Sequence, residues 1–328
     1  MTAATILAIE SPPCRRAPRS PWLPPEPPFP DFVSPRMHPI SLDDLVLQAT
    51  PANGAPAPEL PLGSLDTLWL QVTGTLCNLA CRHCFISCGP KNDSHPFMSK
   101  DQVFDAIDTA TGNGVKEFYF TGGEPFMHPD IVALIERTLA HGPLTILTNG
   151  VLIDAPMAKT LAAIFERSRY SFDLRVSLDG ASAATNDPIR GRGTFDAIVG
   201  GIRHLADIGL NPVITVTEVD ENGSQEEREA FRRLLVEMGL TKPRLKFLAP
   251  FRIGREERRG RGYRDDERLV EGDLVEGEEA SLQCHSCRMV TAKGVYPCPI
   301  LIEVEQARMG DRLEDALRPI RLSHAACY

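Results

Sequence analysis

The sequence predicts an α/β fold built on a parallel sheet. From residue 65 onward, short apolar runs alternate with segments of helical period, and the alternation repeats six times. Repeated strand–helix–strand units place parallel strands side by side through right-handed crossovers. Because six strands are too few to close an eight-stranded barrel, we expect an open partial barrel or a doubly wound sheet. In both architectures, ligands bind at the carboxyl ends of the strands.

Each expected element has its own boundaries in the sequence. The six strands are expected at 67–73, 117–122, 144–149, 172–178, 212–219 and 244–250. Helical patterns lie between and after them at 99–111, 130–141, 155–168, 194–208 and 225–238. Ser99 is expected to cap the first helix, with Gln102 completing a capping box.

The segments that flank this core, which spans 63–251, differ from it in composition. Fifteen of the 28 prolines lie in the first 61 residues, so we expect 1–62 to be disordered or extended, with an amphipathic recognition arm as the alternative. Residues 252–280 carry seven arginines and ten acidic residues, which predicts a charged linker or a lid. The tail, 281–328, is too small for a hydrophobic core of its own, and we expect it to need a metal to fold.

Bulk composition excludes several classes of protein. A formal net charge of −9 and a pI near 5.5 argue against nucleic-acid binding as the main task. No apolar run has transmembrane length, and no stretch has the ordered parts of a signal peptide. Nine cysteines without an export signal are better interpreted as metal or redox ligands than as disulfides. We therefore expect a cytoplasmic protein that does not bind membranes.

The densest cysteine cluster follows the first expected strand, in "GTLCNLACRHCFISCGP" (74–90). Cys77, Cys81 and Cys84 are spaced C-x3-C-x2-C, and Cys88 follows three residues later. Thiolates at this density suit an iron–sulfur cluster or zinc. Three thiolates on a [4Fe–4S] cluster leave one iron open to the amine and carboxylate of a ligand, whereas a fourth closes the site. The role of Cys88 therefore separates an enzyme from an electron-transfer or scaffold protein.

The stretch "CNLACRHC" (77–84) resembles the signature of the radical S-adenosylmethionine (radical SAM) enzymes, and the resemblance covers residues 65–255. It implies a partial (β/α)6 TIM-like barrel with the open iron holding the methionine end of the cofactor, so that Cys88 is not a ligand. It also implies reductive cleavage of S-adenosylmethionine to a 5′-deoxyadenosyl radical, which removes a hydrogen atom from the substrate. Cluster and cofactor carry that chemistry, while the barrel orients them and excludes water.

Further motifs stand at the next strand ends. "FTGGEP" (120–125) contains Gly122 and Gly123, which let the backbone approach a ligand and offer carbonyls to an ammonium group. Glu124 adds a negative charge there, and Pro125 opens a helix. The resemblance implies that this motif holds the amino group of S-adenosylmethionine. Asn149, in "LTNG", is expected to contact the cofactor.

The fourth strand ends in "RVSLDG" (175–180), where Ser177 and Asp179 lie two apart and share a strand face. Both side chains can bond ribose hydroxyls, which is how the resemblance implies that this strand end is used. Arg190, in the loop expected to lead into the next helix, is the best cation for the cofactor carboxylate, with a surface ion pair as the alternative.

The tail carries a second cysteine set, formed by Cys284, Cys287, Cys298 and Cys327. A C-x2-C pair, a third cysteine after a glycine-containing hairpin and a distant fourth are consistent with a four-thiolate site. The tail resembles the SPASM/twitch extension of radical SAM enzymes, which implies a small C-terminal auxiliary iron–sulfur cluster domain. A full SPASM region has more cysteines, so we expect one auxiliary cluster, with zinc as the competing occupant.

The resemblance leaves the substrate class open. We expect a peptide or protein substrate, with oxidation or rearrangement of a small metabolite as the alternative, and a reducing partner such as flavodoxin or ferredoxin. No residue of the chain is assigned a catalytic role. The hypothesis from another class is a non-catalytic iron–sulfur or zinc protein, in which all four cysteines of 77–88 close the first site.

Overall fold

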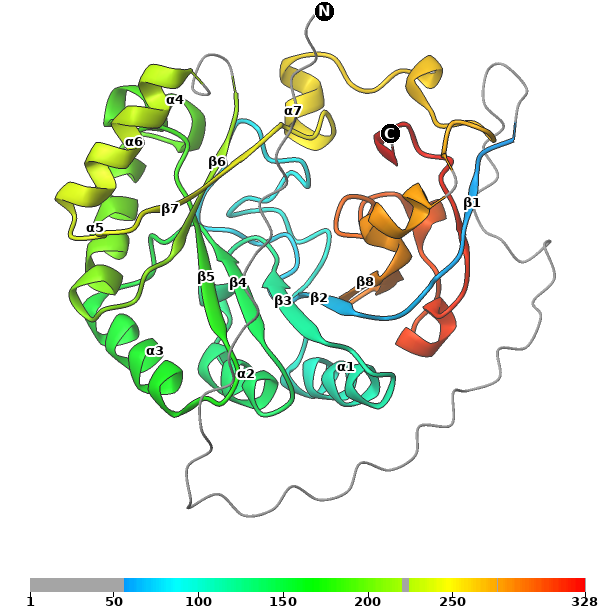
Figure 1. Cartoon of the computed structure of the whole chain (residues 1–328), viewed down its shortest axis with the longest axis horizontal. Helices are drawn as coiled ribbons and strands as arrows, with labels where there is room; N and C mark the ends of the chain where they lie inside the picture. Colours follow the sequence, from blue (N-terminus) through cyan, green and yellow to red (C-terminus); the bar gives the residue numbers. More distant parts are fainter. Residues whose placement is uncertain (1–55, 220–223, 276, 328) are drawn as a thin grey trace, which may run out of the picture. The chain divides into compact units, whose positions relative to one another are not determined.

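The computed structural model describes residues 56–219, 224–275 and 277–327, and its centre is an eight-stranded sheet. Six strands are parallel and lie in chain order: β2 (Thr67–Gln71), β3 (Glu117–Thr121), β4 (Leu144–Thr148), β5 (Phe172–Ser177), β6 (Val213–Thr217) and β7 (Arg244–Leu248). This sequential order is that of a partial barrel, since a doubly wound sheet reverses its strand order at a switch point. All six strands occur where the sequence predicted them (Figure 1).

The helices cover one side of this sheet (Figure 1). They are α1 (Lys100–Gly112), α2 (Ile131–Leu139), α3 (Ala155–Arg167), α4 (Ala183–Arg190), α5 (Thr194–Asp207) and α6 (Gln225–Glu237), while the short α7 (Gly254–Arg259) lies apart from them, at the top of Figure 1. The predicted capping box of α1 is confirmed, since Ser99 and Gln102 exchange hydrogen bonds of 2.8 and 3.1 Å. Within the described part of the chain, no helix is long and apolar enough to cross a membrane.

Two of these helices were not predicted. α4 contains Pro188, and we expected a loop there; Ser182 caps the helix by accepting a hydrogen bond from the Thr185 backbone. α7 lies in the segment that we expected to be a charged linker or lid. The rest of that segment is held by local contacts, including ion pairs of Glu267 with Arg252 and Arg261 at 2.9 Å.

Alternation along the strands separates an outer face from an inner face. On β2, Leu68 and Leu70 are fully buried in the main core against the helices. Trp69 points the other way and stacks on Tyr119 of β3, with ring centroids 4.3 Å apart. Burying each leucine contributes roughly 1.5–3 kcal/mol. The outer face therefore holds sheet and helices together, and the inner face is left for other groups.

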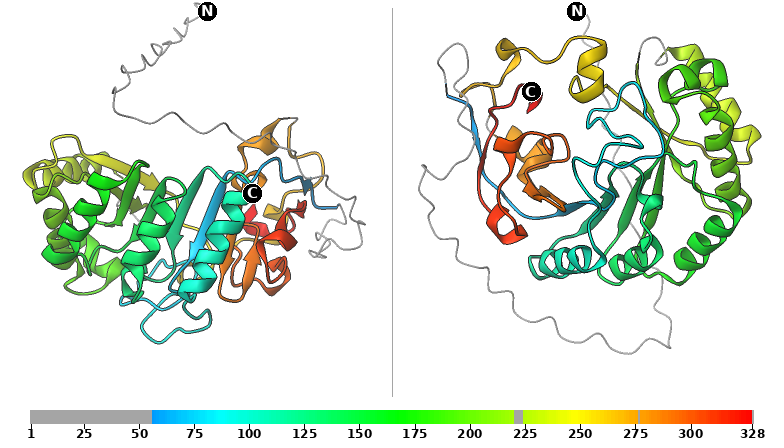
Figure 2. Two further views of the ribbon diagram at one scale, coloured as in Figure 1. Left: turned by 90° about the horizontal axis from the view of Figure 1, so that it is seen from below. Right: turned by 180° about the vertical axis from the view of Figure 1, so that it is seen from behind.

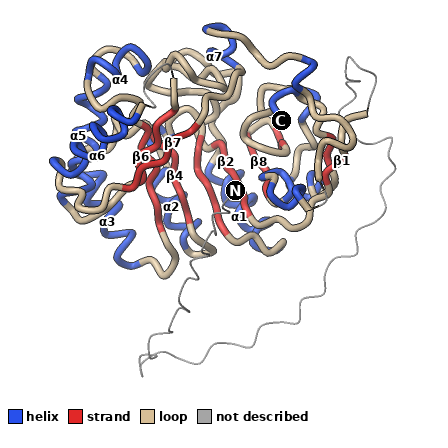
Figure 3. Tube along the Cα trace, turned by 45° about the horizontal axis from the view of Figure 1, so that its top comes forward, coloured by secondary structure: helices blue, strands red, loops and turns tan. Residues whose placement is uncertain are grey.

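The tail packs into the barrel core, and the expectation that it needs a metal to fold stays a prediction. β8 (Cys287–Thr291) pairs in parallel with β2, and β9 (Gly294–Tyr296) returns antiparallel to it. Apolar tail side chains such as Val290 and Leu313 join the main core, so the tail finds in the barrel the apolar partners that it lacks alone. Figure 2 shows the tail, orange to red, beside the blue strand in both views, and Figure 3 shows β8 next to β2.

The predicted disordered segment is shorter than we expected at its carboxyl end. β1 (Glu59–Leu60) pairs antiparallel with β10 (Ile320–Arg321) near the end of the tail, and Leu60 is fully buried. These residues therefore belong to the fold, because the tail supplies a strand that their sequence alone does not reveal. The expectation for residues 1–55 lies outside the described residues.

Candidate functional site

The first cysteine loop, defined as residues 74–90, begins where β2 ends. The Cys77 N–H donates to the Gly89 carbonyl at 3.2 Å, which closes the loop on itself. The Glu124 N–H, after β3, donates to the Leu76 carbonyl at 3.2 Å and ties the loop to the neighbouring strand end. The loop therefore lies at the carboxyl rim of the sheet, where α/β barrels place their ligands.

The three predicted cluster cysteines are near neighbours within this loop. Burial raises the pKa of Cys77 to about 12, and the charges of Glu124 and of the Cys81 and Cys84 thiolates add to the rise. Burial also raises the pKa of Cys81. The pKa of Cys84 is lowered instead, to about 6, first because the Cys88 thiol donates a hydrogen bond to it. Metal binding requires thiolates, so a cation bound here would relieve the repulsion among them.

Hydrogen-bond donors surround the sulfur atoms. The Leu79 N–H lies 3.4 Å from Cys77 Sγ, and the Asn149 amide nitrogen lies 3.7 Å from the same atom. The Arg190 guanidinium lies 3.9 Å from Cys81 Sγ. Donors aimed at sulfur stabilise a thiolate and tune the potential of a cluster that it holds. Asn149 and Arg190, predicted as cofactor contacts, are thus brought to the cysteine loop.

Cys88 is buried at the same place. Its N–H donates to Cys84 Sγ at 3.3 Å, and its thiol lies 3.8 Å from the Gly122 carbonyl oxygen. Cys88 therefore connects the cysteine loop to the glycine turn after β3. The expectation that it is not a ligand stays a prediction, since its thiol lies beside that of a predicted ligand.

The glycine turn lies against the cysteine loop. Gly122 has a φ of +147°, a conformation that L side chains rarely adopt. A Cβ on Gly123 would lie 1.8 Å from the Leu76 carbonyl oxygen and 2.8 Å from Cys77 Cβ. Glycine is therefore required at both positions, and at Gly123 the close approach is to the loop that carries the cysteines.

Glu124 is fully buried at the end of this turn, just before Pro125 opens a short 3-10 helix. Its carboxylate accepts hydrogen bonds from the Phe126 N–H at 3.1 Å, the Thr148 hydroxyl at 2.7 Å and the Asn149 N–H at 2.7 Å. Burial raises the pKa of Glu124 to about 7, and these hydrogen bonds oppose the rise. We expected this acid beside an ammonium group; in the structure it joins the ends of β3 and β4.

Asp179 and Arg190 form a buried ion pair. The Arg190 Nε lies 2.7 Å from Asp179 Oδ2, and the His83 Nε2 lies 2.5 Å from the same oxygen. The Thr217 N–H donates to Asp179 Oδ1 at 2.8 Å. Burial alone would raise the pKa of Asp179. The charge of Arg190, the charge and hydrogen bond of His83 and the hydrogen bond from Thr217 together outweigh burial and lower the pKa to about 2. The surface ion pair considered for Arg190 is wrong, because only 6% of this residue is exposed.

This pairing was not part of the predictions, which assigned Asp179 and Arg190 separate cofactor groups. His83, which lies in the first cysteine loop, also reaches Asp179. Ser177 lies two residues before Asp179 at the end of β5, opposite Thr215 of β6. The three predicted residues therefore meet at one strand end, and their cofactor contacts stay predictions.

Sequence reasoning missed the role of Arg255, which reaches the first cysteine loop from α7. Its guanidinium donates to the carbonyls of Cys81 at 2.8 Å and Ser87 at 2.9 Å, and also to that of Cys88. Its own N–H donates to the Cys84 carbonyl at 3.0 Å. The only sequence signal for it is its place in "FRIGRE" (251–256), far along the chain from the cysteines.

The four tail cysteines are brought together from distant positions. Burial raises the pKa of Cys284, Cys287, Cys298 and Cys327. The raised pKa is about 12 for Cys298 and for Cys327. The charge of a Cys284 thiolate raises the pKa of each of the other three further. Cys287 lies in a second buried cluster, and Cys298 and Cys327 pack against that cluster.

Arg288 lies next to these cysteines and is fully buried. Its guanidinium donates to the carbonyls of Cys284 at 2.8 Å, Cys287 at 2.7 Å, Ala316 at 2.7 Å and Arg318 at 2.8 Å. Burial lowers its pKa to about 10, opposed by the charges of the tail thiolates. One side chain therefore fixes the backbone at both members of the C-x2-C pair, and this role was also missed from the sequence.

The donor chemistry at both places fits iron–sulfur clusters. Buried thiols are the ligands that such clusters take, and the close approach of Gly123 shapes the backbone beside Cys77. Among residues 56–219, 224–275 and 277–327, no three His, Cys, Asp or Glu side chains form a group that could hold a single metal ion. The thiols of a cluster need not converge on one point, because each binds a different iron.

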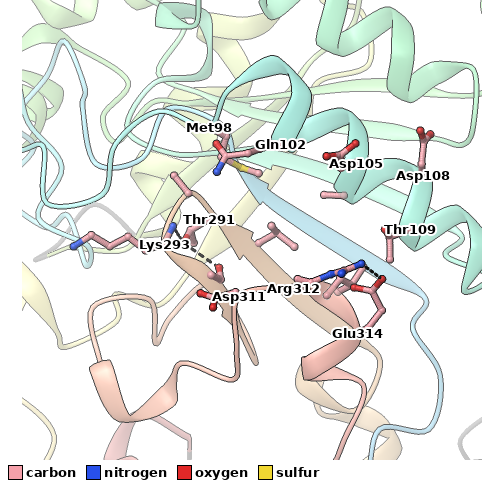
Figure 4. Close-up of a pocket in the computed structure, with 15 residues that line it drawn as sticks. Met98, Gln102, Asp105, Asp108, Thr109, Thr291, Lys293, Asp311, Arg312 and Glu314 are labelled. Carbon is pink, nitrogen blue, oxygen red and sulfur yellow. Dashed lines mark hydrogen bonds and ion pairs between the residues drawn. The ribbon is translucent and has the colours of Figure 1, made fainter.

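A cavity of about 580 Å³ lies elsewhere, between α1 and the tail (Figure 4). Gln102 and Asp105 of α1 line one side, and Lys293 and Arg312 of the tail line the other. None of the predicted ligands is among its lining residues. This cavity is therefore separate from the strand-end site.

Comparisons with known proteins agree with the geometry. A family described as the Radical SAM superfamily matches residues 72–235, half of the chain. Mycofactocin maturase MftC of Mycobacterium tuberculosis is 38% identical over 154 residues, 44% of this chain and 38% of that protein. A GTP 3′,8-cyclase of Petrotoga mobilis is 30% identical over 181 residues, 54% of each chain. The matches thus span about two fifths to one half of the length of these curated relatives.

Solved structures share the fold. SuiB of Streptococcus suis superposes with a TM-score of 0.57 at 18% identity, covering 80% of this chain and 67% of that one. The structure titled native anSMEcpe with bound AdoMet gives a TM-score of 0.56 at 16% identity, covering 76% of this chain and 79% of that one. These likenesses and the strand order confirm the partial barrel, and the auxiliary cluster domain stays a prediction. With its family match over half of its length, this chain belongs to the radical SAM superfamily.

Proposed function

We propose that the chain is a radical SAM enzyme whose first cysteine loop holds a [4Fe–4S] cluster on Cys77, Cys81 and Cys84. The observation that carries this proposal is the meeting of the predicted motifs around that loop. The Glu124 N–H bonds the Leu76 carbonyl, the Asn149 amide reaches Cys77, and the Arg190 guanidinium reaches Cys81. Residues that follow two different strand ends, and one from the end of helix α4, thus converge on a thiol-rich loop, which a structural turn would not require.

The residues of the chain have distinct tasks in this proposal. The glycine turn offers backbone carbonyls to the amino group of S-adenosylmethionine, and Ser177, with the Asp179–Arg190 pair, holds its ribose and carboxylate. Glu124 keeps the ends of β3 and β4 in register through its three hydrogen bonds. Cluster and cofactor together supply a radical that removes hydrogen from the substrate; the chain orients them and excludes water.

For the substrate we propose a peptide or protein, and for the tail an auxiliary cluster on its four cysteines. The similarity to proteins named mycofactocin maturase supports a maturase activity. The similarity to GTP 3′,8-cyclases supports the second candidate, which is rearrangement of a small metabolite. A flavodoxin or ferredoxin supplies the electron in the cytoplasm. The barrel spans 63–251, followed by a linker or lid at 252–280 and the auxiliary region at 281–328.

The test of this function is anaerobic. The protein is reconstituted with iron and sulfide and reduced with dithionite, and its paramagnetic resonance spectrum is recorded before and after S-adenosylmethionine is added. A changed spectrum together with 5′-deoxyadenosine supports an open iron. Cys81→Ala should lose both signals. An unchanged spectrum without 5′-deoxyadenosine, from intact clusters, would favour the closed-site alternative.

A further inference from the structure

The inner face of the sheet carries three cations, of which Arg244 is paired with Asp173. The other two are Arg175 on β5 and Lys246 on β7. Val176, next to Arg175, is buried in the main core against the helices, so Arg175 points to the other side. Phe247, next to Lys246, packs edge-on against Phe231 of α6, with ring centroids 6.0 Å apart. Strand alternation therefore places both cations on the inner face of the sheet. The carboxyl rim that carries the candidate site is at one end of this face.

Neither cation has an acidic partner among the described residues. Arg175 donates to the Tyr119 hydroxyl at 3.3 Å and lies 5.1 Å from the centre of that ring. No hydrogen bond or ion pair of the Lys246 ammonium exists within the described parts of the chain. Burial and the positive charge of Arg175 both lower the pKa of Lys246, which means that the two side chains repel each other.

The acids on this face are already engaged. Asp173 receives two hydrogen bonds from Arg244, at 2.7 and 2.9 Å. Glu117 accepts from the Thr67 hydroxyl at 3.0 Å and from that of Tyr119 at 3.4 Å. Across β2–β7 the inner face thus presents three cations against two acids, which leaves one uncompensated positive charge.

Two polar side chains on the inner face have unpaired atoms. Gln71 shares the face of Trp69 on β2 and is fully buried, yet neither its amide oxygen nor its amide nitrogen has a hydrogen-bond partner. The buried Thr215 hydroxyl also lacks one. Thr215 lies directly opposite Lys246 in the β6–β7 pairing, on the same face. Buried polar groups are normally bonded, and unbonded ones that face a protein interior need an explanation.

We propose that the inner face binds a carboxylate of the substrate between Arg175 and Lys246, with the Thr215 hydroxyl as a further partner. This assignment rests on the proposed function, because it gives the substrate of the same barrel its chemical class. The planar guanidinium fork matches a carboxylate, and the ammonium adds a second charge-assisted hydrogen bond. The carboxylate is that of a peptide, either at its carboxyl terminus or on an Asp or Glu side chain.

The test measures ligand retention by the full chain, reconstituted anaerobically, without any need for S-adenosylmethionine cleavage. The protein is dialysed to equilibrium against an equimolar pool of the N-acetylated amino acids and their amides, together with GTP, and bound ligand is counted by mass spectrometry. We expect acids to be retained about tenfold better than the matching amides. The amides of N-acetyl-Asp and N-acetyl-Glu, which keep a side-chain carboxylate, distinguish the two sources.

Arg175→Met and Lys246→Met should each lower acid retention about tenfold and leave retention of the neutral amides unchanged. Lys246 is exposed, so its variant tests the proposal even where Arg175→Met fails to fold. Lys242→Met, an exposed lysine just before β7, is the matched control and should retain acids as the wild type does. Three results would overturn the proposal: equal retention of acids and amides, an acid preference that survives in Lys246→Met, or retention of GTP above every acid. A protein that retains acids without cleaving S-adenosylmethionine would refute only the proposed function.

Discussion

The two cysteine regions of the molecule are each held by one arginine, but they are assembled in opposite ways. In the first region the cysteines lie within twelve consecutive residues, and Arg255 reaches them from a helix some 170 positions along the chain. In the tail the cysteines are scattered over more than forty residues, and Arg288 is the direct neighbour of one of them. In the first region the cysteines are thus close together in the sequence and the arginine is distant. In the tail the cysteines are far apart and the arginine is adjacent to one of them.

This difference predicts how each region responds when its arginine is substituted. Arg255 is only partly buried and bonds a loop at the rim, so its loss affects one loop. Arg288 is fully buried in a strand of the main sheet, so its loss affects the whole fold. Both arginines donate to backbone carbonyls, which fixes loop shape without supplying a ligand. We therefore expect the two arginines to differ in how much of the molecule depends on them.

The largest effect is expected for Arg288→Met. The change keeps side-chain volume but leaves four carbonyls without their donor, two of them buried and two partly buried. At roughly 1 kcal/mol or more for each unsatisfied group, the free energy of unfolding should fall by about 4 kcal/mol. Urea denaturation of the cluster-free protein under reducing conditions measures it. Arg312→Met removes an arginine whose side chain is 75% exposed and should change the free energy of unfolding by less than about 0.5 kcal/mol. If the free energy of unfolding fell equally in the two variants, Arg288 would stabilise the fold no more than an exposed arginine does.

Asp179→Asn should come next. The variant keeps the shape of the side chain but leaves the buried Arg190 charge without its counterion, which typically costs roughly 3–5 kcal/mol. We expect the lower end, about 3 kcal/mol, because the Arg190 guanidinium also lies near Cys81 Sγ. Since the pKa of Asp179 is lowered to about 2 in the folded protein, its stabilisation is present above pH 4 and is lost as the pH falls towards 2. The difference from wild type in denaturation of the cluster-free protein should therefore shrink in acid. A difference independent of pH would contradict the buried pair.

Arg255→Met should have a smaller and local effect. Three carbonyls of the first cysteine loop lose a donor, but they lie at the rim where water can replace it. We expect the first cluster to lose iron to a chelator about tenfold faster, which corresponds to about 1.4 kcal/mol, with little change in the urea midpoint. Measuring this in a Cys284→Ser, Cys287→Ser background isolates the first region. Arg258→Met, on the same helix but exposed, is the control. A tail cluster that loses iron equally fast in the otherwise native chain would remove the distinction between the regions.

How much of this could be known from the sequence follows from the range of the contacts involved. Strand positions were predictable because apolar alternation is a local property, and the site motifs meet because parallel strands end at one rim. The hydrogen bond from Arg255 to the Cys81 carbonyl joins residues 174 positions apart, and no local sequence pattern indicates it. The pairing of β8 with β2 is equally long-range. The Asp179–Arg190 pair was missed because each residue was matched to a ligand group and not to the other.

The smallest change in stability is expected for Cys88→Ala. This variant separates a three-thiolate first site from a four-thiolate one. The Cys88 thiol touches Cys84 and the Gly122 carbonyl, while the N–H that bonds Cys84 Sγ belongs to the backbone and survives the substitution. If three thiolates hold the first cluster, the variant should keep its iron content, and only the potential of the cluster should shift, because one donor to sulfur is lost. Cys84→Ala, the matched neighbour, should lose the cluster. If Cys88→Ala loses it too, the first region is a closed four-thiolate site, and the two cysteine regions would then differ only in how they are assembled.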